Sequence, residues 1–78
     1  MKEVKIYSTP TCMYCRAMKD FFKKHDVQYI DFDVSTDAIK REEMIEKSGQ
    51  MGVPVVFIGN EIIVGFDKER LSKLLDIS

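Results

Sequence analysis

The 78-residue sequence contains no long apolar run and no excess of basic residues. A transmembrane helix needs at least about 18 consecutive apolar residues, so we expect no association with a membrane. Twelve lysines and arginines are balanced by thirteen acidic residues, whereas a nucleic-acid-binding face needs a basic excess to neutralise phosphates. We therefore expect no nucleic acid among the partners of this protein.

Repeats, linkers and low-complexity segments are absent too. A chain of this length has room for one domain, which we place at residues 1–78. The first seven residues alternate charged and apolar side chains, and so lack the apolar core of a secretion signal. We therefore expect the protein in the cytoplasm, and we expect a monomer.

Cysteine and histidine are scarce, since Cys12, Cys15 and His25 are the only residues of these types. A structural zinc site normally needs four ligands, so we expect no metal site and no permanently bound cofactor. Structural disulfides are rare in the cytoplasm, and a disulfide that closes so short a loop would restrict the unfolded chain little. The cysteine pair therefore indicates chemistry rather than a crosslink.

Apolar residues alternate in some segments and recur at helical spacing in others. Alternation, or a short apolar run, predicts strands over residues 2–7, 29–34, 53–58 and 61–64. Helical spacing predicts helices over residues 13–24, over 37–47 and after residue 67. Their N-terminal caps are expected at Thr11 or Cys12, at Thr36 and at Asp67.

The resulting order, β-α-β-α-β-β-α, predicts an α/β fold with a four-stranded mixed sheet flanked by three helices. Strands joined through a helix are expected to pair in parallel. Gly59-Asn60 reads as a two-residue turn, which makes the last two strands an antiparallel hairpin.

The spacing of the two cysteines suits disulfide exchange, which needs one thiolate to attack and a second thiol to resolve the mixed disulfide. The predicted helix places Cys12 at its N-terminus, where unpaired N–H groups and the helix dipole stabilise negative charge. Cys15 follows nearly one turn later on the same face. We therefore expect Cys12 to be the nucleophile and Cys15 the resolving thiol, while Arg16 and Lys19 could add positive potential.

Two further features each have a functional and a plain structural interpretation. Pro54 suits the first residue of a strand, but a cis bond at Val53–Pro54 would instead turn the Val53 backbone outward toward a substrate. Gly65-Phe66-Asp67 reads either as a strand-to-helix turn with Asp67 as the cap, or as an exposed helix start that binds an anion.

Three motifs follow one another along the chain: Thr11-Cys12-Met13-Tyr14-Cys15, Val53-Pro54 and Gly65-Phe66-Asp67. Through them the chain resembles the glutaredoxins over nearly its whole length, and it looks most similar to the short bacterial glutaredoxin-like proteins of the YruB type. The resemblance implies a thioredoxin-like fold with a cis Pro54. It also implies reduction of protein disulfides or glutathione mixed disulfides, with glutathione as the electron donor. The glutathione and substrate groove would be formed by Tyr14, Arg41, Gln50, Val53, Pro54, Gly65, Phe66 and Asp67.

The sequence departs from the glutaredoxin pattern at four positions, where a lysine, a proline, a threonine and a glycine are usual: Thr9, Met13, Gly52 and Val64. The change at Thr9 removes a cation near the Cys12 thiolate. Two alternatives stay open. One keeps the chemistry but takes electrons from thioredoxin reductase or another flavoprotein reductase, as do redoxins that supply ribonucleotide reductase. The other is a [2Fe–2S] cluster held between two subunits by Cys12 and glutathione.

Overall fold

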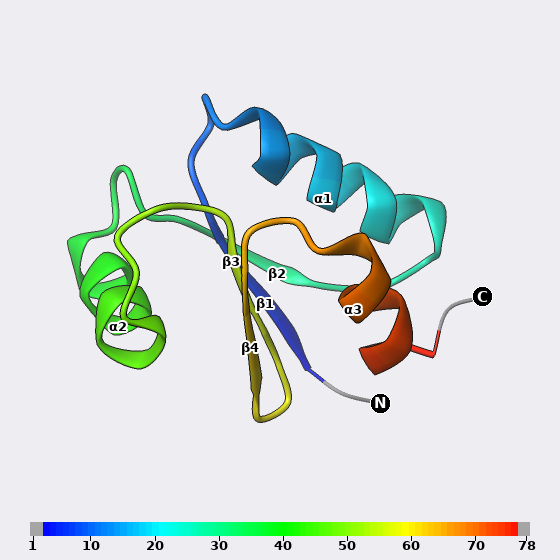
Figure 1. The fold of residues 1–78 in the computed structure, drawn as a ribbon. Coiled ribbons are helices and arrows are strands. Elements are labelled where there is room, and N and C mark those ends of the chain that lie inside the picture. The colour runs from blue at the N-terminus through cyan, green and yellow to red at the C-terminus, as the bar shows by residue number, and fades with distance from the viewer. Residues whose placement is uncertain (1–2, 77–78) are drawn as a thin grey trace.

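The computed structural model describes residues 3–76, and its element order is the predicted one (Figure 1). The elements are β1 (Val4–Ser8), α1 (Met13–Lys24), β2 (Ile30–Asp33), α2 (Ala38–Ser48), β3 (Val55–Ile58), β4 (Glu61–Val64) and α3 (Lys68–Leu74). Residue 2 of the first predicted strand lies outside the described residues. Within residues 3–76, no helix has the length and apolar character that a membrane span requires.

The strands form one mixed sheet in the order β2-β1-β3-β4. β1 and β2 are parallel, and β3 and β4 form the predicted antiparallel hairpin. The expected parallel direction of β3 is wrong, because β3 runs antiparallel to β1 with Val55 opposite Tyr7. β2 ends beside Ser8 and β3 begins beside Tyr7. The segment that carries α2 therefore leaves and re-enters the sheet at one end and does not travel its length.

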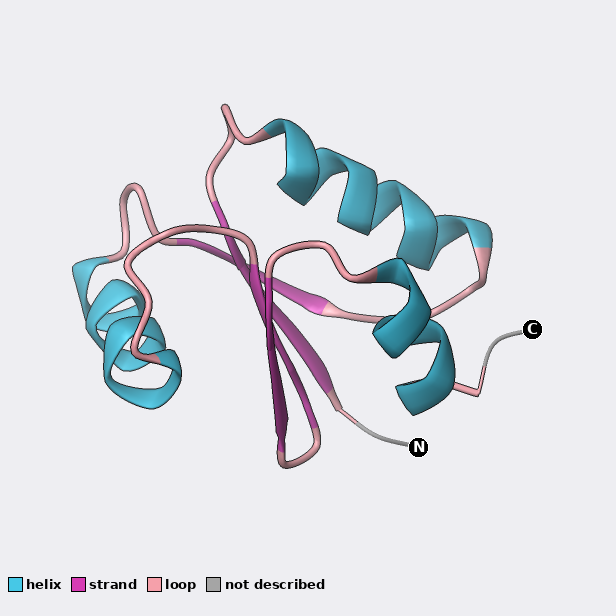
Figure 2. Ribbon diagram, in the orientation of Figure 1, coloured by secondary structure: helices cyan, strands magenta, loops and turns pink. Residues whose placement is uncertain are grey.

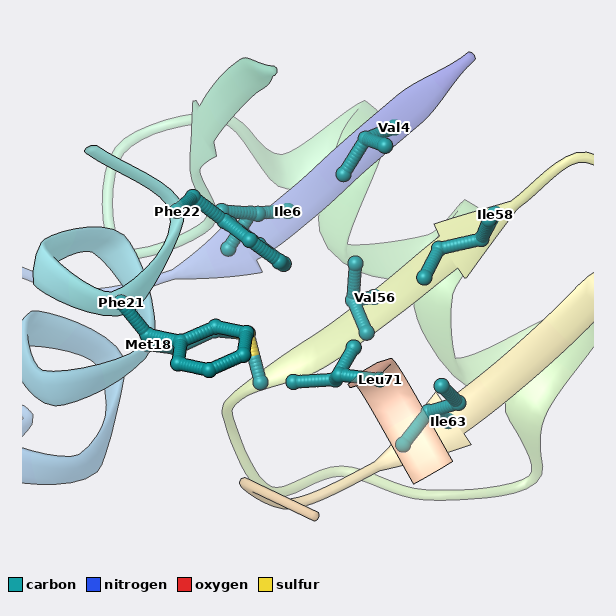
Figure 3. Packing of buried hydrophobic residues seen from close by; sticks show 9 residues of the cluster. All are labelled: Val4, Ile6, Met18, Phe21, Phe22, Val56, Ile58, Ile63 and Leu71. Atoms are coloured by element: carbon teal, nitrogen blue, oxygen red, sulfur yellow. The ribbon is translucent and has the colours of Figure 1, made fainter. Parts of the chain in front are cut away.

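The helices cover both faces of the sheet, with α1 and α3 on one face and α2 on the other (Figure 2). Successive side chains of a strand point to opposite faces, so β1 and β3 supply residues to two separate cores. The core under α1 and α3 consists of Val4, Ile6, Met18, Phe21, Phe22, Val56, Ile58, Ile63 and Leu71 (Figure 3). Met18 and Phe22 are fully buried there, which confirms the predicted apolar face of α1.

The core under α2 is centred on Tyr7, whose ring packs against Phe57 at a centroid distance of 4.8 Å. The Tyr7 hydroxyl donates a hydrogen bond of 2.8 Å to Glu43 of α2. Lys40 and Lys47 lie 3.2 and 3.6 Å from the same carboxylate. The hydrogen bond from Tyr7, helped by the two lysines, lowers the pKa of Glu43. This polar contact attaches α2 to the sheet.

The sequence predicted Thr36 as the N-terminal cap of α2. This prediction is wrong, because the cap is Asp37. The Asp37 carboxylate accepts a hydrogen bond from the backbone N–H of Lys40 at 3.1 Å. Thr36 is occupied by the preceding turn, where its hydroxyl donates to the carbonyl of Asp33 at 3.3 Å. At the other end of α2, Gly49 adopts a φ of 71°, a left-handed conformation that favours glycine and ends the helix.

β3 begins two residues later than predicted, at Val55. Val53 and Pro54 therefore precede the ladder, where a proline removes no ladder hydrogen bond. β2 lies at an edge of the sheet, and its Ile30 side chain is 47% exposed rather than part of either core. These two differences leave the strand order and the hairpin unchanged.

Leu71 is the buried residue of α3 and anchors this helix to the sheet. We expect Leu71→Ala to lower the free energy of unfolding by about 2–5 kcal/mol, because the truncation leaves a cavity. Urea denaturation followed by circular dichroism measures the change. Ile39→Ala, at an exposed position of α2, is the control and should change this free energy by less than about 0.5 kcal/mol. Equal midpoints for the two variants would contradict this packing.

The lowered pKa of Glu43 predicts a sensitivity to acid. The stability that this carboxylate contributes is complete above its ordinary pKa of 4.5 and is lost as the pH falls through the lower folded value. In Glu43→Gln this ionisation is absent, so its free energy of unfolding should fall less than that of the wild type between about pH 5 and about pH 3. Glu46→Gln, at an exposed position of the same helix, should behave like the wild type. Parallel curves for the wild type and Glu43→Gln would argue against the Tyr7 contact.

Candidate active site

Cys12 stands at the end of the loop that joins β1 to α1. Its backbone N–H donates to the carbonyl of Thr9 at 3.3 Å, and its extended backbone makes it the N-cap of α1, as predicted. The Cys12 sulfur accepts a hydrogen bond from the N–H of Cys15 at 3.1 Å. This is the position that a hydroxyl or carboxylate oxygen usually takes at a helix start. The Cys12 sulfur thus lies at the N-terminal end of α1, next to the free N–H groups of the first turn.

Cys15 is fully buried, whereas Cys12 is partly exposed, and neither is in a disulfide. Burial and the hydrogen-bonded contact with Cys12 raise the pKa of the Cys15 thiol to about 12. A backbone hydrogen bond from Thr9 and the charge of Lys19 act in the opposite direction. Cys15 is therefore protonated at neutral pH. The pair combines one accessible sulfur at a helix start with one buried thiol next to it.

The second and third sequence motifs approach the cysteines from β3 and β4. The Cys12 sulfur lies 3.9 Å from the carbonyl oxygen of Val53. The Val53–Pro54 bond is cis, as the resemblance implied, and Pro54 is buried. The Pro54 carbonyl accepts a hydrogen bond of 2.8 Å from the N–H of Gly65. Gly65 has a φ of 82°, which favours glycine at this position. The fold thus brings three motifs that are distant in sequence to one place.

Phe66 and Asp67 follow this contact in the chain. The Phe66 ring is half-buried and packs edge-on against Phe21 of α1, with centroids 5.9 Å apart. The Asp67 carboxylate accepts a hydrogen bond from the backbone N–H of Arg70 at 3.1 Å and caps α3, as predicted. The plain structural interpretation of this turn is therefore confirmed, and the carboxylate remains exposed to solvent.

Tyr14, Arg41 and Gln50 are the other candidates for binding. The side chain of Tyr14 is 70% exposed on the first turn of α1, beside both cysteines. Arg41 and Gln50 are exposed on α2 and directly after it. Within residues 3–76, no hydrogen bond joins either of them to the cysteine pair. Figure 1 shows α2 apart from the N-terminus of α1. The structure thus places Tyr14 at the cysteines but does not bring Arg41 and Gln50 there.

A polar network beside Cys15 was not predicted from the sequence. Lys19 follows Cys15 by one helical turn, and its ammonium lies 2.6 Å from Asp31 of β2. The other oxygen of Asp31 accepts a hydrogen bond of 2.7 Å from Ser8, whose side chain is buried. Lys19 was expected only as a possible source of positive potential. The network depends on the parallel pairing of Ile6 with Asp31, which turns Asp31 and Ser8 toward α1. Knowledge of this pairing would have been needed to predict it.

The described residues contain no group of three or more histidine, cysteine and acidic side chains that could hold a metal ion.

The sequence matches the family model described as Glutaredoxin over residues 4–63. An uncharacterised glutaredoxin-like 8.6 kDa protein in the rubredoxin operon of Clostridium pasteurianum is 45% identical over 73 residues, which cover 94% of this chain and 97% of that protein. Glutaredoxin 3 of Escherichia coli is 39% identical over 67 residues, covering 86% of this chain and 81% of that protein.

Solved structures show the same fold. A mutant of the thioredoxin-like protein BC3987 has a TM-score of 0.93 and 36% identity, with full coverage of both chains. The glutaredoxin of Archaeoglobus fulgidus has a TM-score of 0.86 and 28% identity, covering 96% of this chain and 87% of that one. A complex of buckwheat glutaredoxin with glutathione has a TM-score of 0.79 and 25% identity, covering 97% and 76%. These likenesses confirm the predicted thioredoxin-like fold.

The network beside Cys15 makes a testable prediction. Lys19→Met removes the positive charge that lowers the pKa of Cys15, so the thiolate fraction of Cys15 should fall. In a Cys12→Ser background, the ultraviolet absorbance of the Cys15 thiolate should therefore develop at a higher pH when Lys19 is also replaced. Lys23→Met makes the same change of charge at an exposed position of α1 and should leave this titration unchanged. Equal shifts in both variants would refute a specific role for Lys19.

Proposed function

Because the chain belongs to the glutaredoxin family, we propose that it is a dithiol thiol–disulfide oxidoreductase with Cys12 as the nucleophile and Cys15 as the resolving thiol. The observation that carries this proposal is the asymmetry of the pair. The Cys12 sulfur is partly exposed and accepts the N–H of Cys15 at 3.1 Å, while the Cys15 thiol is buried beside it. Attack from solvent is therefore open to Cys12 alone.

The reaction proceeds in two exchanges. The Cys12 thiolate attacks one sulfur of a substrate disulfide, forms a mixed disulfide and releases the other sulfur as a thiolate, which takes up a proton. The Cys15 thiol then loses its proton and attacks the Cys12 sulfur, which releases the second substrate thiol. The substrate disulfide has gained two electrons, and the protein holds a Cys12–Cys15 disulfide. The Cys15 thiol can attack from its buried position, because the Cys15 backbone N–H already contacts the Cys12 sulfur.

We propose glutathione as the electron donor that reduces this disulfide again, and protein disulfides or glutathionylated proteins as the substrates. A relative of the same fold has been solved in complex with glutathione. In this chain we expect the groove to be formed by residues near Cys12, with the cation of Arg41 and the amide of Gln50 at its far end. The residues near Cys12 are Tyr14, Val53, Pro54, Gly65, Phe66 and Asp67. We place this activity in a monomer in the cytoplasm, where thiols are kept reduced.

A second candidate keeps the chemistry and takes electrons from thioredoxin reductase or another flavoprotein reductase, for delivery to an enzyme such as ribonucleotide reductase. The observation in its favour is Thr9, whose carbonyl accepts the N–H of Cys12. Its neutral side chain supplies no cation there for the carboxylates of glutathione. The [2Fe–2S] alternative, in which Cys12 and glutathione would hold the cluster between two subunits, stays a prediction. Anaerobic reconstitution tests it, since a cluster would give a brown protein.

The donor assignment is tested by following NADPH oxidation with hydroxyethyl disulfide as the substrate. The oxidised protein receives either glutathione with glutathione reductase, or thioredoxin reductase alone. We expect turnover with glutathione and none in Cys12→Ser, because no thiolate can then attack. Cys15→Ser should still reduce a glutathionylated substrate, since glutathione itself can resolve that intermediate. Turnover with thioredoxin reductase alone would overturn the donor assignment in favour of the second candidate, and turnover by Cys12→Ser would overturn the mechanism.

A further inference from the structure

Cys15 has no access to water in this structure, because its side chain is fully buried. In the proposed second exchange its thiol must lose a proton and carry a negative charge at this buried position. Burial disfavours that charge and raises the pKa of the Cys15 thiol to about 12. The groups that offset this effect of burial therefore decide how fast the mixed disulfide on Cys12 is resolved.

Cys12 is one of the groups that keep Cys15 protonated before the reaction starts. Its hydrogen-bonded contact with Cys15 and its negative charge both raise the pKa of the Cys15 thiol. Once Cys12 is joined to a substrate, its sulfur carries no charge. Two groups that lower the pKa of Cys15 then remain, the backbone N–H of Thr9 and the ammonium of Lys19.

Lys19 is held beside Cys15 by contacts that involve two strands. The two residues are four apart on α1, so their side chains lie on one face of the helix. Asp31 of β2 lies 2.6 Å from the Lys19 ammonium and accepts a hydrogen bond of 2.7 Å from the buried Ser8 of β1. Ser8 is followed directly by Thr9. One polar network thus connects both groups that favour the Cys15 thiolate.

The other cations of α1 are placed differently. Arg16 is exposed directly after Cys15, and Lys23 is exposed one turn beyond Lys19. The Lys19 side chain is only 22% exposed and has a partner at 2.6 Å, so solvent screens its charge less. From the side of β3, the segment over residues 52–54 carries no charge. A charge effect on Cys15 should therefore be specific to Lys19.

We propose that Lys19 accelerates the second exchange by placing a positive charge beside Cys15, and that Asp31 moderates this charge. This inference rests on the proposed function of Cys15 as the resolving thiol. The Cys15 thiol gives its proton to water, and its sulfur forms a bond with the Cys12 sulfur. The substrate thiolate leaves with the electron pair of the broken disulfide and takes up a proton. Lys19 stabilises the attacking thiolate, because opposite charges attract strongly where water is scarce.

A single turnover with dithiobis(nitrobenzoic acid) times the two exchanges separately. Attack by Cys12 releases one coloured nitrothiobenzoate, and attack by Cys15 on the mixed disulfide releases the second. We expect Lys19→Met to slow the second release about threefold and to leave the first unchanged. The loss of the cation lowers the thiolate fraction of Cys15, and the greater nucleophilicity of the more basic thiolate offsets part of this loss.

Three variants separate the charge of Lys19 from its packing. Lys19→Arg keeps the charge and should restore the rate of the second release. Lys23→Met removes an exposed charge from the same helix and should leave both releases unchanged. Asp31→Asn removes the opposing carboxylate and keeps an oxygen that can accept the hydrogen bond from Ser8. The second release should therefore become faster in Asp31→Asn, opposite to the effect of Lys19→Met.

A second release of unchanged rate in Lys19→Met would overturn this inference. Equal slowing in Lys19→Met and Lys19→Arg would do the same, as would slowing in both Lys19→Met and Asp31→Asn, since either result gives the pair a purely structural role. The proposed function stands in all these cases if the wild type gives two releases and Cys15→Ser gives one. A single release from the wild type, or two from Cys15→Ser, would instead overturn the proposed function itself.

Discussion

The arrangement of the site depends on one contact, the hydrogen bond from the N–H of Cys15 to the sulfur of Cys12. It makes a cysteine side chain the cap of a helix, so the same bond that starts α1 also holds the Cys12 sulfur in place. The helix must then be fixed relative to the sheet, and its buried residues Met18 and Phe22 do this. A thiol in a flexible loop would have neither the electrostatic support of the helix nor a defined distance to Cys15.

The two cores have different tasks around this contact. The core under α1 and α3 fixes the helix that carries the cysteines and the helix that follows Gly65. The core under α2 contains Val55 and packs against Val53, and so supports the segment that faces Cys12 from the opposite side. The two central strands, β1 and β3, contribute side chains to both cores, because successive side chains of a strand point to opposite faces. The site lies where these two independently packed halves meet.

The sequence predicted the fold class, the element order and the position of Cys12 at a helix start, because these follow from local spacing. It failed where the outcome depends on pairing between segments. Both directions of β3 are compatible with the connection through α2, and only the register of Val55 against Tyr7 decides between them. Thr36 and Asp37 are both residue types that cap helices, and the hydrogen bond of Thr36 with the preceding turn leaves Asp37 as the cap. The contact of Lys19 with a strand residue likewise required knowledge of strand pairing.

The burial of Cys15 beside Cys12 has a consequence for oxidative damage. An exposed thiolate reacts with peroxides and becomes a sulfenic acid, which further oxidation converts irreversibly to the sulfinic acid. A sulfenic acid at Cys12 would form within reach of the Cys15 thiol, since the Cys15 backbone lies 3.1 Å from that sulfur. Condensation of the two releases water and gives the ordinary disulfide. The buried thiol would thereby turn an oxidation that inactivates a single cysteine into a disulfide that a reductant can reverse.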